Sequence, residues 1–157
     1  MEFVTSIAIP VAAIGSGLMA GVFLTFSSFV MRALGQVPTA AGMEVMKAIN
    51  VTVINTSFMA GFLGTAALCG LLVIGALLGI IDGGPQLIAG CLLYLVGTFG
   101  VTIAFNVPRN DHLDGLETGT SEADAYWQTY QREWTWWNHC RTVCSLLAAG
   151  LLTSAIS

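Results

Sequence analysis

Five side chains that could do chemistry lie at the start of the last apolar run of this sequence: Trp134, Trp137, Asn138, His139 and Arg141. Ionisable groups are costly inside a lipid bilayer, and where a membrane segment retains them they mark functional sites. Indole rings can stack on planar molecules, and guanidinium and amide groups can hold an anion. This stretch is therefore the first candidate for a catalytic or binding site.

Helical spacing assigns these residues to two faces of one helix. Trp134, Asn138 and Arg141 are three or four residues apart and share a face, whereas His139 lies about 100° round from Asn138. On the shared face, Arg141 and Asn138 could donate hydrogen bonds to a developing oxyanion, beside a stacking wall of Trp134 and Trp137. His139, whose imidazole titrates near neutral pH, could act as the base that removes a proton.

Each of these residues also has a purely structural interpretation. Arg141 could extend its guanidinium to lipid phosphates while its aliphatic stem stays in the apolar zone. Tryptophan and tyrosine concentrate at membrane interfaces, which explains Trp127 and Tyr130 without any substrate. His139 could simply form a hydrogen bond with a facing helix. The residue pattern leaves both interpretations open.

Composition predicts that the site lies in a membrane protein. Of the 157 residues, 55% are apolar and only 9% are charged, against about 25% charged in an ordinary soluble domain. Apolar runs of membrane-spanning length recur along the whole chain, so we expect a single integral membrane domain over residues 1–157. The predicted spans are 4–31, 57–81, 85–105 and 134–156.

The segments between the spans complete an all-α prediction. Met43, Met46 and Ile49 recur at helical spacing and predict an amphipathic helix at the membrane interface before the second span. Asn106-Val107-Pro108 should end the third span, because proline disfavours helical geometry in the preceding residue. Ser121 is a candidate start for a long fourth helix whose first turns extend into the cytoplasm. The predicted fold is therefore a four-helix transmembrane bundle.

Two pairs of glycines in the predicted spans have the GxxxG spacing. Gly17 and Gly21 lie in the first span, and Gly75 and Gly79 lie in the second. This spacing lets helix backbones approach closely where lipid provides no hydrophobic drive for association. It therefore predicts tight helix packing.

The basic residues predict the orientation, because all five fall on one side of the predicted topology: Arg32, Lys47, Arg109, Arg132 and Arg141. Lysine and arginine near span ends are retained in the cytoplasm. We therefore expect the long connections to be cytoplasmic and both termini to lie outside. The opposite side carries only acidic side chains, Glu2 and Asp82.

Several classes of function fit the sequence poorly. The formal net charge is -4, and the basic face that nucleic-acid binding needs is missing from the sequence. Two histidines without a Glu-x-x-His pair argue against a di-iron carboxylate bundle, and the four cysteines lack the CxxC spacing of a metal or redox site. We therefore expect no nucleic-acid partner and no metal site.

Two motifs resemble the paired signature of the anthrone oxygenase family: Asn106-Val107-Pro108-Arg109-Asn110-Asp111-His112-Leu113, and then Trp134, Trp137-Asn138-His139 and Arg141. The resemblance extends over essentially the whole chain. It implies a four-helix membrane protein, in bacteria one of the inner membrane. It also implies oxidation of an anthrone to an anthraquinone by molecular oxygen, without a metal or flavin cofactor.

The resemblance, combined with the residue chemistry, gives a list of expected site residues. His139, Arg141 and Asn138 are the expected catalytic residues, as base and oxyanion donors. The expected substrate-binding residues are Trp134, Trp137, Asn106 and Asn110. Because polar groups at membrane depth need partners, we also expect Asn106 or Asn110 within hydrogen-bond reach of Asn138 or Arg141.

A second class of function fits the same features. The chain could be a non-catalytic small membrane subunit or a lipophile-binding protein, in which the polar cluster only seals the bundle. Its partners would then be the lipid bilayer and a hydrophobic aromatic small molecule, or further copies or other subunits of a membrane complex. Genomic neighbours or a pigment that co-purifies would distinguish this alternative from an oxygenase.

Overall fold

The computed structural model describes residues 4–156, and all secondary structure in this range is helical. Residues 1–3, among them the Glu2 of the predicted outer side, and Ser157 lie outside the described range. The first helical stretch consists of η1 (Val4–Ala8), α1 (Ile9–Thr25), η2 (Phe26–Val30) and α2 (Met31–Leu34). The second consists of α3 (Thr39–Thr52), the 3-10 turn η3 (Val53–Asn55) and α4 (Ser57–Leu77).

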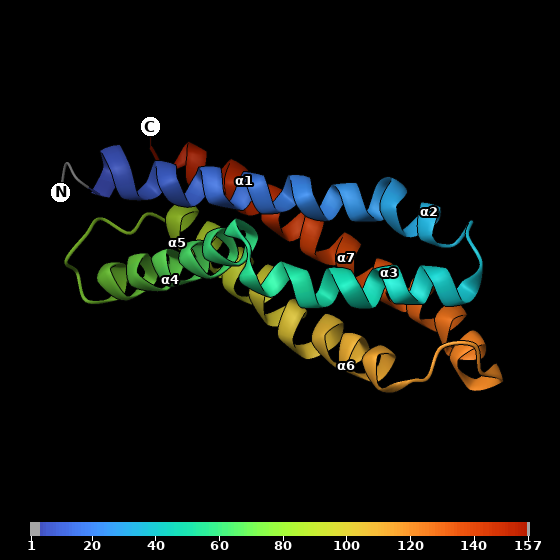
Figure 1. Ribbon diagram of the computed structural model, residues 1–157. Coiled ribbons are helices and arrows are strands. Elements are labelled where there is room, and N and C mark those ends of the chain that lie inside the picture. The colour runs from blue at the N-terminus through green and yellow to red at the C-terminus, as the bar shows by residue number, and fades with distance from the viewer. Residues whose placement is uncertain (1–3, 157) are drawn as a thin grey trace.

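The second half of the chain forms two long helical stretches. One consists of α5 (Pro85–Leu92), the π-helical η4 (Leu93–Gly100) and η5 (Thr102–Asn106), and α6 (Val107–Gly115). The other is the unbroken α7 (Ser121–Ser154). Both termini and the α4–α5 connection lie at one end of the molecule, and the α2–α3 and α6–α7 connections lie at the opposite end (Figure 1).

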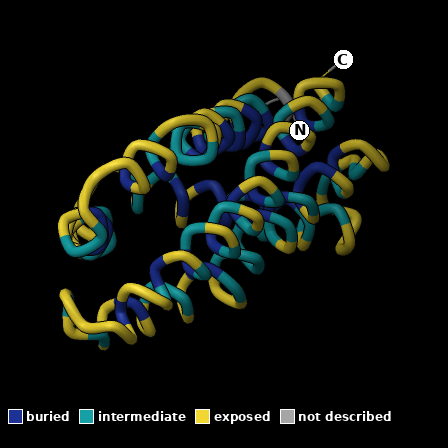
Figure 2. Tube along the Cα trace, turned by 90° about the vertical axis from the view of Figure 1, so that its right-hand side faces the viewer, coloured by how far each residue is buried: buried dark blue, intermediate teal, exposed yellow. Residues whose placement is uncertain are grey.

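The surface of the bundle is apolar enough to face lipid. Buried residues follow the inner sides of the helices and exposed residues the outer sides (Figure 2). The exposed residues include large apolar side chains, and Leu71, Leu77 and Val96 are each at least 66% exposed. Within residues 4–156, three helices are long and apolar enough to cross a membrane: Ser6–Leu34, Ser57–Leu77 and Pro85–Gly115. These features indicate an integral membrane protein.

The third predicted span continues well beyond its expected end. Pro108 does not stop the helix, which runs on through α6 to Gly115. The turns before the proline adopt π-helical geometry, and such local adjustment lets membrane helices accommodate the missing N–H of proline. The Arg109 Nη1 group also donates to the Phe105 carbonyl at 2.7 Å, so a side chain supplies a hydrogen bond within this turn.

The second predicted span ends earlier than its apolar run. Gly79 has a φ of +67°, a conformation that glycine adopts readily, and it follows the last turn of α4. The Ile80 N–H donates to the Gly75 carbonyl at 2.9 Å, which completes a Schellman-type helix end. Gly75 and Gly79 therefore end a helix, and the prediction that they pack two helices together was wrong.

Other small residues bring α7 close to its neighbours. A Cβ atom at Gly90 would lie 3.0 Å from Cγ of Leu152, and one at Gly97 would overlap Cys144. Beside these contacts, Thr98 and Ser145 share a buried hydrogen bond of 2.8 Å between their hydroxyl groups. Close backbone approach and polar contacts of this kind are typical of helix packing inside a membrane.

The α7 helix is the longest element and carries the predicted site. Its N-cap is Thr120, whose hydroxyl accepts a hydrogen bond from the Ala123 N–H at 3.2 Å, so Ser121 is the first helical residue rather than the cap. The helix has 34 residues, which corresponds to about 51 Å at 1.5 Å per residue. Its first turns pack against α3, where Gly42, Met43 and Met46 are buried.

Candidate functional site

The middle of α7 turns Trp134, Asn138 and Arg141 into the bundle. Their side chains are buried, with 5%, 0% and 5% of their surface exposed. The shared face that their spacing predicts is therefore an inner face of the molecule. Because Arg141 is buried within the protein, its guanidinium does not reach out to lipid phosphates.

Neutral and aromatic groups surround the Arg141 guanidinium. Its Nη2 donates to Oδ1 of Asn138 at 2.6 Å, and its Nη1 donates to Oγ1 of Thr102 at 3.2 Å. The guanidinium carbon lies 4.3 Å from the ring centroid of Phe23 and 5.1 Å from that of Trp134, within the range of cation–π attraction. The Nε atom is buried without a hydrogen-bond partner.

Arg141 has no acidic partner among the described residues. The ion pair that the structure does contain in this range joins Arg109 to Glu133, on another side of α7. A buried cation without a counter-ion is expensive, because its hydration is lost and no opposite charge replaces it. This environment favours an anion, or a group that becomes anionic, close to Arg141.

Asn138 fixes the position of Arg141. Its Nδ2 group donates to the Phe23 carbonyl at 2.6 Å and to the Ser27 hydroxyl at 2.5 Å, so its donors are directed to the first helical stretch. Its Oδ1 is then left to accept from Arg141. Asn138 thus lies where it was predicted, beside Arg141, but it orients the guanidinium and directs no free donor toward a ligand.

Arg141 lies at the wall of an apolar cavity of about 270 Å³. The cavity lies beside the junction of α3 and α4, and α1, α6 and α7 enclose its other sides. Its apolar lining includes Phe26, Met46, Ile49, Phe58 and Met59. Its polar and charged lining consists of Asn50, Thr102, Asn110, Asp111 and Arg141, together with the indole of Trp134. Such a cavity suits a largely apolar ligand with one or two polar groups.

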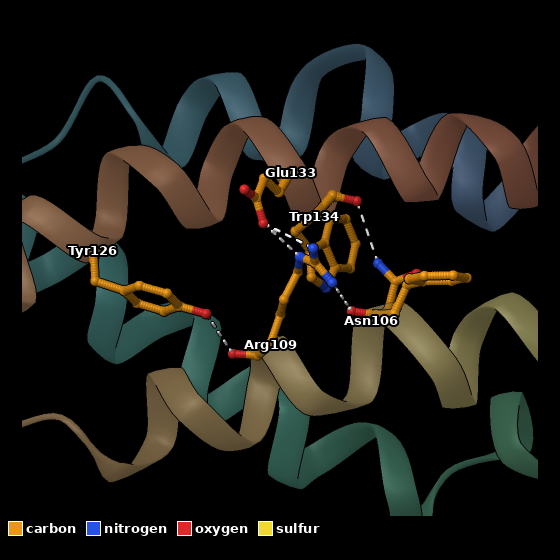
Figure 3. Close-up of polar contacts among 6 residues, drawn as sticks. Asn106, Arg109, Tyr126, Glu133 and Trp134 are labelled. Atoms are coloured by element: carbon orange, nitrogen blue, oxygen red, sulfur yellow. Dashed lines mark hydrogen bonds and ion pairs between the residues drawn. The ribbon is translucent and has the colours of Figure 1, made fainter.

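The two asparagines of the first motif hold Trp134 rather than Arg141. Nδ2 of Asn106 donates to the Trp134 carbonyl at 3.2 Å (Figure 3). Oδ1 of Asn110 accepts from Nε1 of Trp134 at 2.9 Å and from the Tyr130 hydroxyl at 2.8 Å. The prediction that Asn106 or Asn110 lies within hydrogen-bond reach of Asn138 or Arg141 was therefore wrong for the described residues. Both asparagines form hydrogen bonds with Trp134 instead.

Burial keeps the Tyr130 hydroxyl, which contacts Asn110, protonated. The pKa of Tyr130 is raised above its ordinary value, mainly because the ring is desolvated between the helices. At neutral pH the group is therefore a hydrogen-bond donor, which matches its contact with Oδ1 of Asn110. Asn110 and Trp134 therefore form a fixed polar wall of the cavity, and the Tyr130 hydroxyl, which is outside the lining, helps to hold Asn110 in place.

An ion pair locks α6 to α7 beside this wall. Nε and Nη2 of Arg109 donate to Oε2 of Glu133 at 3.0 and 2.8 Å, and the Tyr126 hydroxyl donates to the Arg109 carbonyl at 3.4 Å (Figure 3). The pair is partly exposed, so its contribution to stability is modest. Its position nevertheless holds the two predicted motifs together.

The structure separates the remaining predicted residues from the cavity. Trp137 stacks on Phe105, with ring centroids 3.6 Å apart and planes at 8°, so a side chain already covers one of its faces. His139 is exposed. Both residues line a groove on the other side of α7, and neither lines the cavity that holds Arg141. The predicted catalytic set is therefore divided between two places.

Residues that the sequence did not single out complete the cavity. Asp111 lines it, although only its neighbour Asn110 was predicted to bind substrate. The position of Asp111 between Asn110 and His112 in the first motif could have identified it as a candidate site residue. Phe23, Asn50 and Thr102 come from three other helical stretches, and no spacing along one helix could have grouped them with Arg141.

Replacing Asn138 should destabilise the protein measurably. Asn138→Ala removes an acceptor from a buried guanidinium, and an unsatisfied buried polar group costs about 1–3 kcal/mol. Reversible unfolding in mixed detergent micelles measures this change. Thr153→Ala is the matched control, because Thr153 lies on the same helix with an exposed hydroxyl bonded to Ala149. Equal stability of the two variants would contradict the role given to Asn138.

The fold and site define a helical integral membrane protein with a buried arginine at an apolar cavity. The chain belongs to the anthrone oxygenase family, whose sequence profile matches residues 53–151 and confirms the resemblance. The match includes Thr102, Asn110, Asp111, Trp134 and Arg141 of the cavity wall. No curated protein and no solved structure matches the chain.

Proposed function

We propose that this protein is a membrane oxygenase that uses molecular oxygen to oxidise a lipophilic phenolic compound of the anthrone type. Membership of the anthrone oxygenase family supports this class of reaction. The observation that carries the proposal is the Arg141 guanidinium, buried at the wall of an apolar cavity and without an acidic partner in the described range. An enolate or phenolate oxygen formed beside it would supply the missing negative charge.

The volume and lining of the cavity support this proposal. Its volume of about 270 Å³ lies just below the usual range for small-molecule sites, about 300–1,000 Å³. Aromatic rings from three helical stretches, Phe26, Phe58 and Trp134, line it. A compact, planar and mostly apolar molecule would therefore fit, with its polar edge toward Arg141.

We assign proton removal to Asp111. It is the acidic side chain in the cavity lining, whereas His139 lies in the groove on the other side of α7. Asp111 is exposed and lines the edge of the cavity, where its carboxylate could take the proton from the activated C–H group of the substrate while Arg141 stabilises the resulting enolate oxygen. Trp134, fixed by Asn106 and Asn110, would form the stacking wall.

Molecular oxygen completes the reaction without a further reductant. The enolate passes one electron to O₂, and the two radicals combine to form a carbon–oxygen bond. Protonation by Asp111 then gives a hydroperoxide. Cleavage of its O–O bond, with loss of the remaining C–H proton, yields the new carbonyl group and water. The substrate carbon is oxidised, one oxygen atom stays in the quinone and the other leaves as water, so the proposal needs O₂ as the only co-substrate.

The proposed topology makes α7 the fourth transmembrane helix of a bundle, with α3 at the cytoplasmic interface. Arg32, Lys47, Arg109 and Arg132 lie near the α2–α3 and α6–α7 connections, whereas Arg141 lies near the middle of α7. The end of the molecule with these two connections should face the cytoplasm, and the termini should face the outside, in bacteria across the inner membrane. The cavity would then open near the cytoplasmic leaflet.

Cysteine labelling tests this orientation. In a background without native cysteines, a membrane-impermeant maleimide should label Glu117→Cys only after the cells are permeabilised. Asp82→Cys, in the opposite connection, is the matched control and should be labelled in intact cells. Labelling of Glu117→Cys from outside, with Asp82→Cys protected, would reverse the proposed orientation.

Oxygen uptake tests the function itself. Membranes that contain the protein should consume oxygen when anthrone-like phenols are added, and the quinone product should appear with matching stoichiometry. Membranes from cells without the protein provide the background. Tight binding of such compounds without uptake across the panel would instead support the non-catalytic, lipophile-binding alternative.

A further inference from the structure

A broad groove on the outer side of α7 is separate from the Arg141 cavity. Its volume is about 1140 Å³, and it shares no lining residue with the cavity. The charged residues in its lining are Arg32, Arg109, Arg132, Glu133 and His139. Three arginines therefore face one carboxylate, and the groove carries an excess of positive charge even when the histidine is neutral.

Two of these arginines are free to bind a ligand. Arg109 is engaged with Glu133, at 2.8 Å. For Arg32 and Arg132, both exposed, the described part of the chain contains neither a hydrogen bond nor an ion pair of the side chain. Nε2 of Gln131 donates to the Met31 carbonyl at 3.4 Å, so the turns that carry Arg132 and Arg32 are in contact. Both arginines line the groove.

The groove lies at the level where an apolar span ends. Arg32 belongs to the last turns of the apolar helix Ser6–Leu34. On the facing helix, Trp136 is 64% exposed and lines the groove just before the apolar half of α7. Exposed tryptophan and arginine at the end of a span are typical of the headgroup layer of a bilayer.

We propose that this groove binds the phosphate-bearing headgroup of an anionic phospholipid. The phosphate lies between Arg32 and Arg132, where two guanidinium groups provide charge-assisted hydrogen bonds. The acyl chains run along the exposed apolar surface beside Trp136. A lipid fits better than a soluble phosphate compound, because the exposed indole of Trp136 gives the groove an apolar margin at the end of an apolar span. The lipid site is independent of the oxygenase reaction.

Lipid titration of the purified protein in mild detergent tests this site. Native mass spectrometry should show that phosphatidylglycerol binds more tightly than phosphatidylcholine with the same acyl chains. A basic residue near an anionic lipid surface contributes enough to change affinity about fivefold, so the double variant R32Q/R132Q should lose about 30-fold. Lys47→Gln removes the same charge outside the groove and should bind phosphatidylglycerol within about twofold of the wild type.

Each contrary outcome decides against the lipid site. Equal affinity for the two lipids, or an unchanged affinity of R32Q/R132Q, would overturn it. Displacement of phosphatidylglycerol by glycerol phosphate at similar concentration would overturn it in favour of a soluble phosphate ligand. If the double variant does not fold, Arg132→Gln alone replaces it, with an expected loss of about fivefold.

Discussion

Replacing Arg141 by alanine should lower the rate of oxygen uptake with an anthrone-like substrate by about 10²- to 10³-fold, the usual effect of losing one donor to an oxyanion. Arg141 is the cation in the cavity lining, and neutral groups from Asn138 and Thr102 hold it in place. Without it, the enolate oxygen would form in an apolar cavity with no positive charge beside it. The measurement is turnover per folded protein, with folding checked by gel filtration.

The Arg141→Lys variant separates the effect of the positive charge on the rate from the effect of the guanidinium geometry. Arg141→Lys should recover only part of the lost rate, because an ammonium group is a point charge and does not reproduce the planar set of guanidinium donors. Lys47→Ala removes a basic side chain that lies outside the cavity lining, and its rate should match that of the wild type. Full activity of a folded Arg141→Ala variant would rule out oxyanion stabilisation by this residue.

Local spacing predicted more of the architecture than of the site. The apolar runs 57–81 and 85–105 correspond to helices of the structure, because twenty apolar residues leave few alternatives to a helix in lipid. Their ends depend on details that hydropathy does not contain. Gly79 ends α4 through a left-handed backbone conformation, and π-helical turns carry the chain past Pro108.

The site was predictable only within one helix. The spacing of Trp134, Asn138 and Arg141 placed them together correctly, because residues three or four apart share a helix face. Contacts between helices depend on rotation and depth, which one sequence does not fix. For that reason the partners of Asn106 and Asn110 were predicted wrongly, and the place of Asp111 in the same cavity as Arg141 was not predicted at all.

Replacing Asp111 by asparagine should lower turnover by about 10²- to 10⁴-fold, the usual contribution of a general base. The substitution keeps the size of the side chain and removes its ability to accept a proton. Substrate affinity should change much less than the rate, because Arg141 and the aromatic lining remain. Asp114→Asn is the matched control, since Asp114 lies on the same helix and is exposed like Asp111 but does not line the cavity.

The pH dependence of the Asp111→Asn variant distinguishes a lost base from a damaged cavity. If proton removal is the missing step, raising the pH should restore part of the rate, because more of the substrate then ionises without help from the protein. A distorted cavity would instead leave the rate low at every pH. His139→Ala provides the decisive comparison, since His139 is the base that the sequence indicates. His139→Ala could lose activity that raised pH restores, while Asp111→Asn keeps the full rate. That result would place the proton acceptor, and the bound substrate, on the groove side of α7.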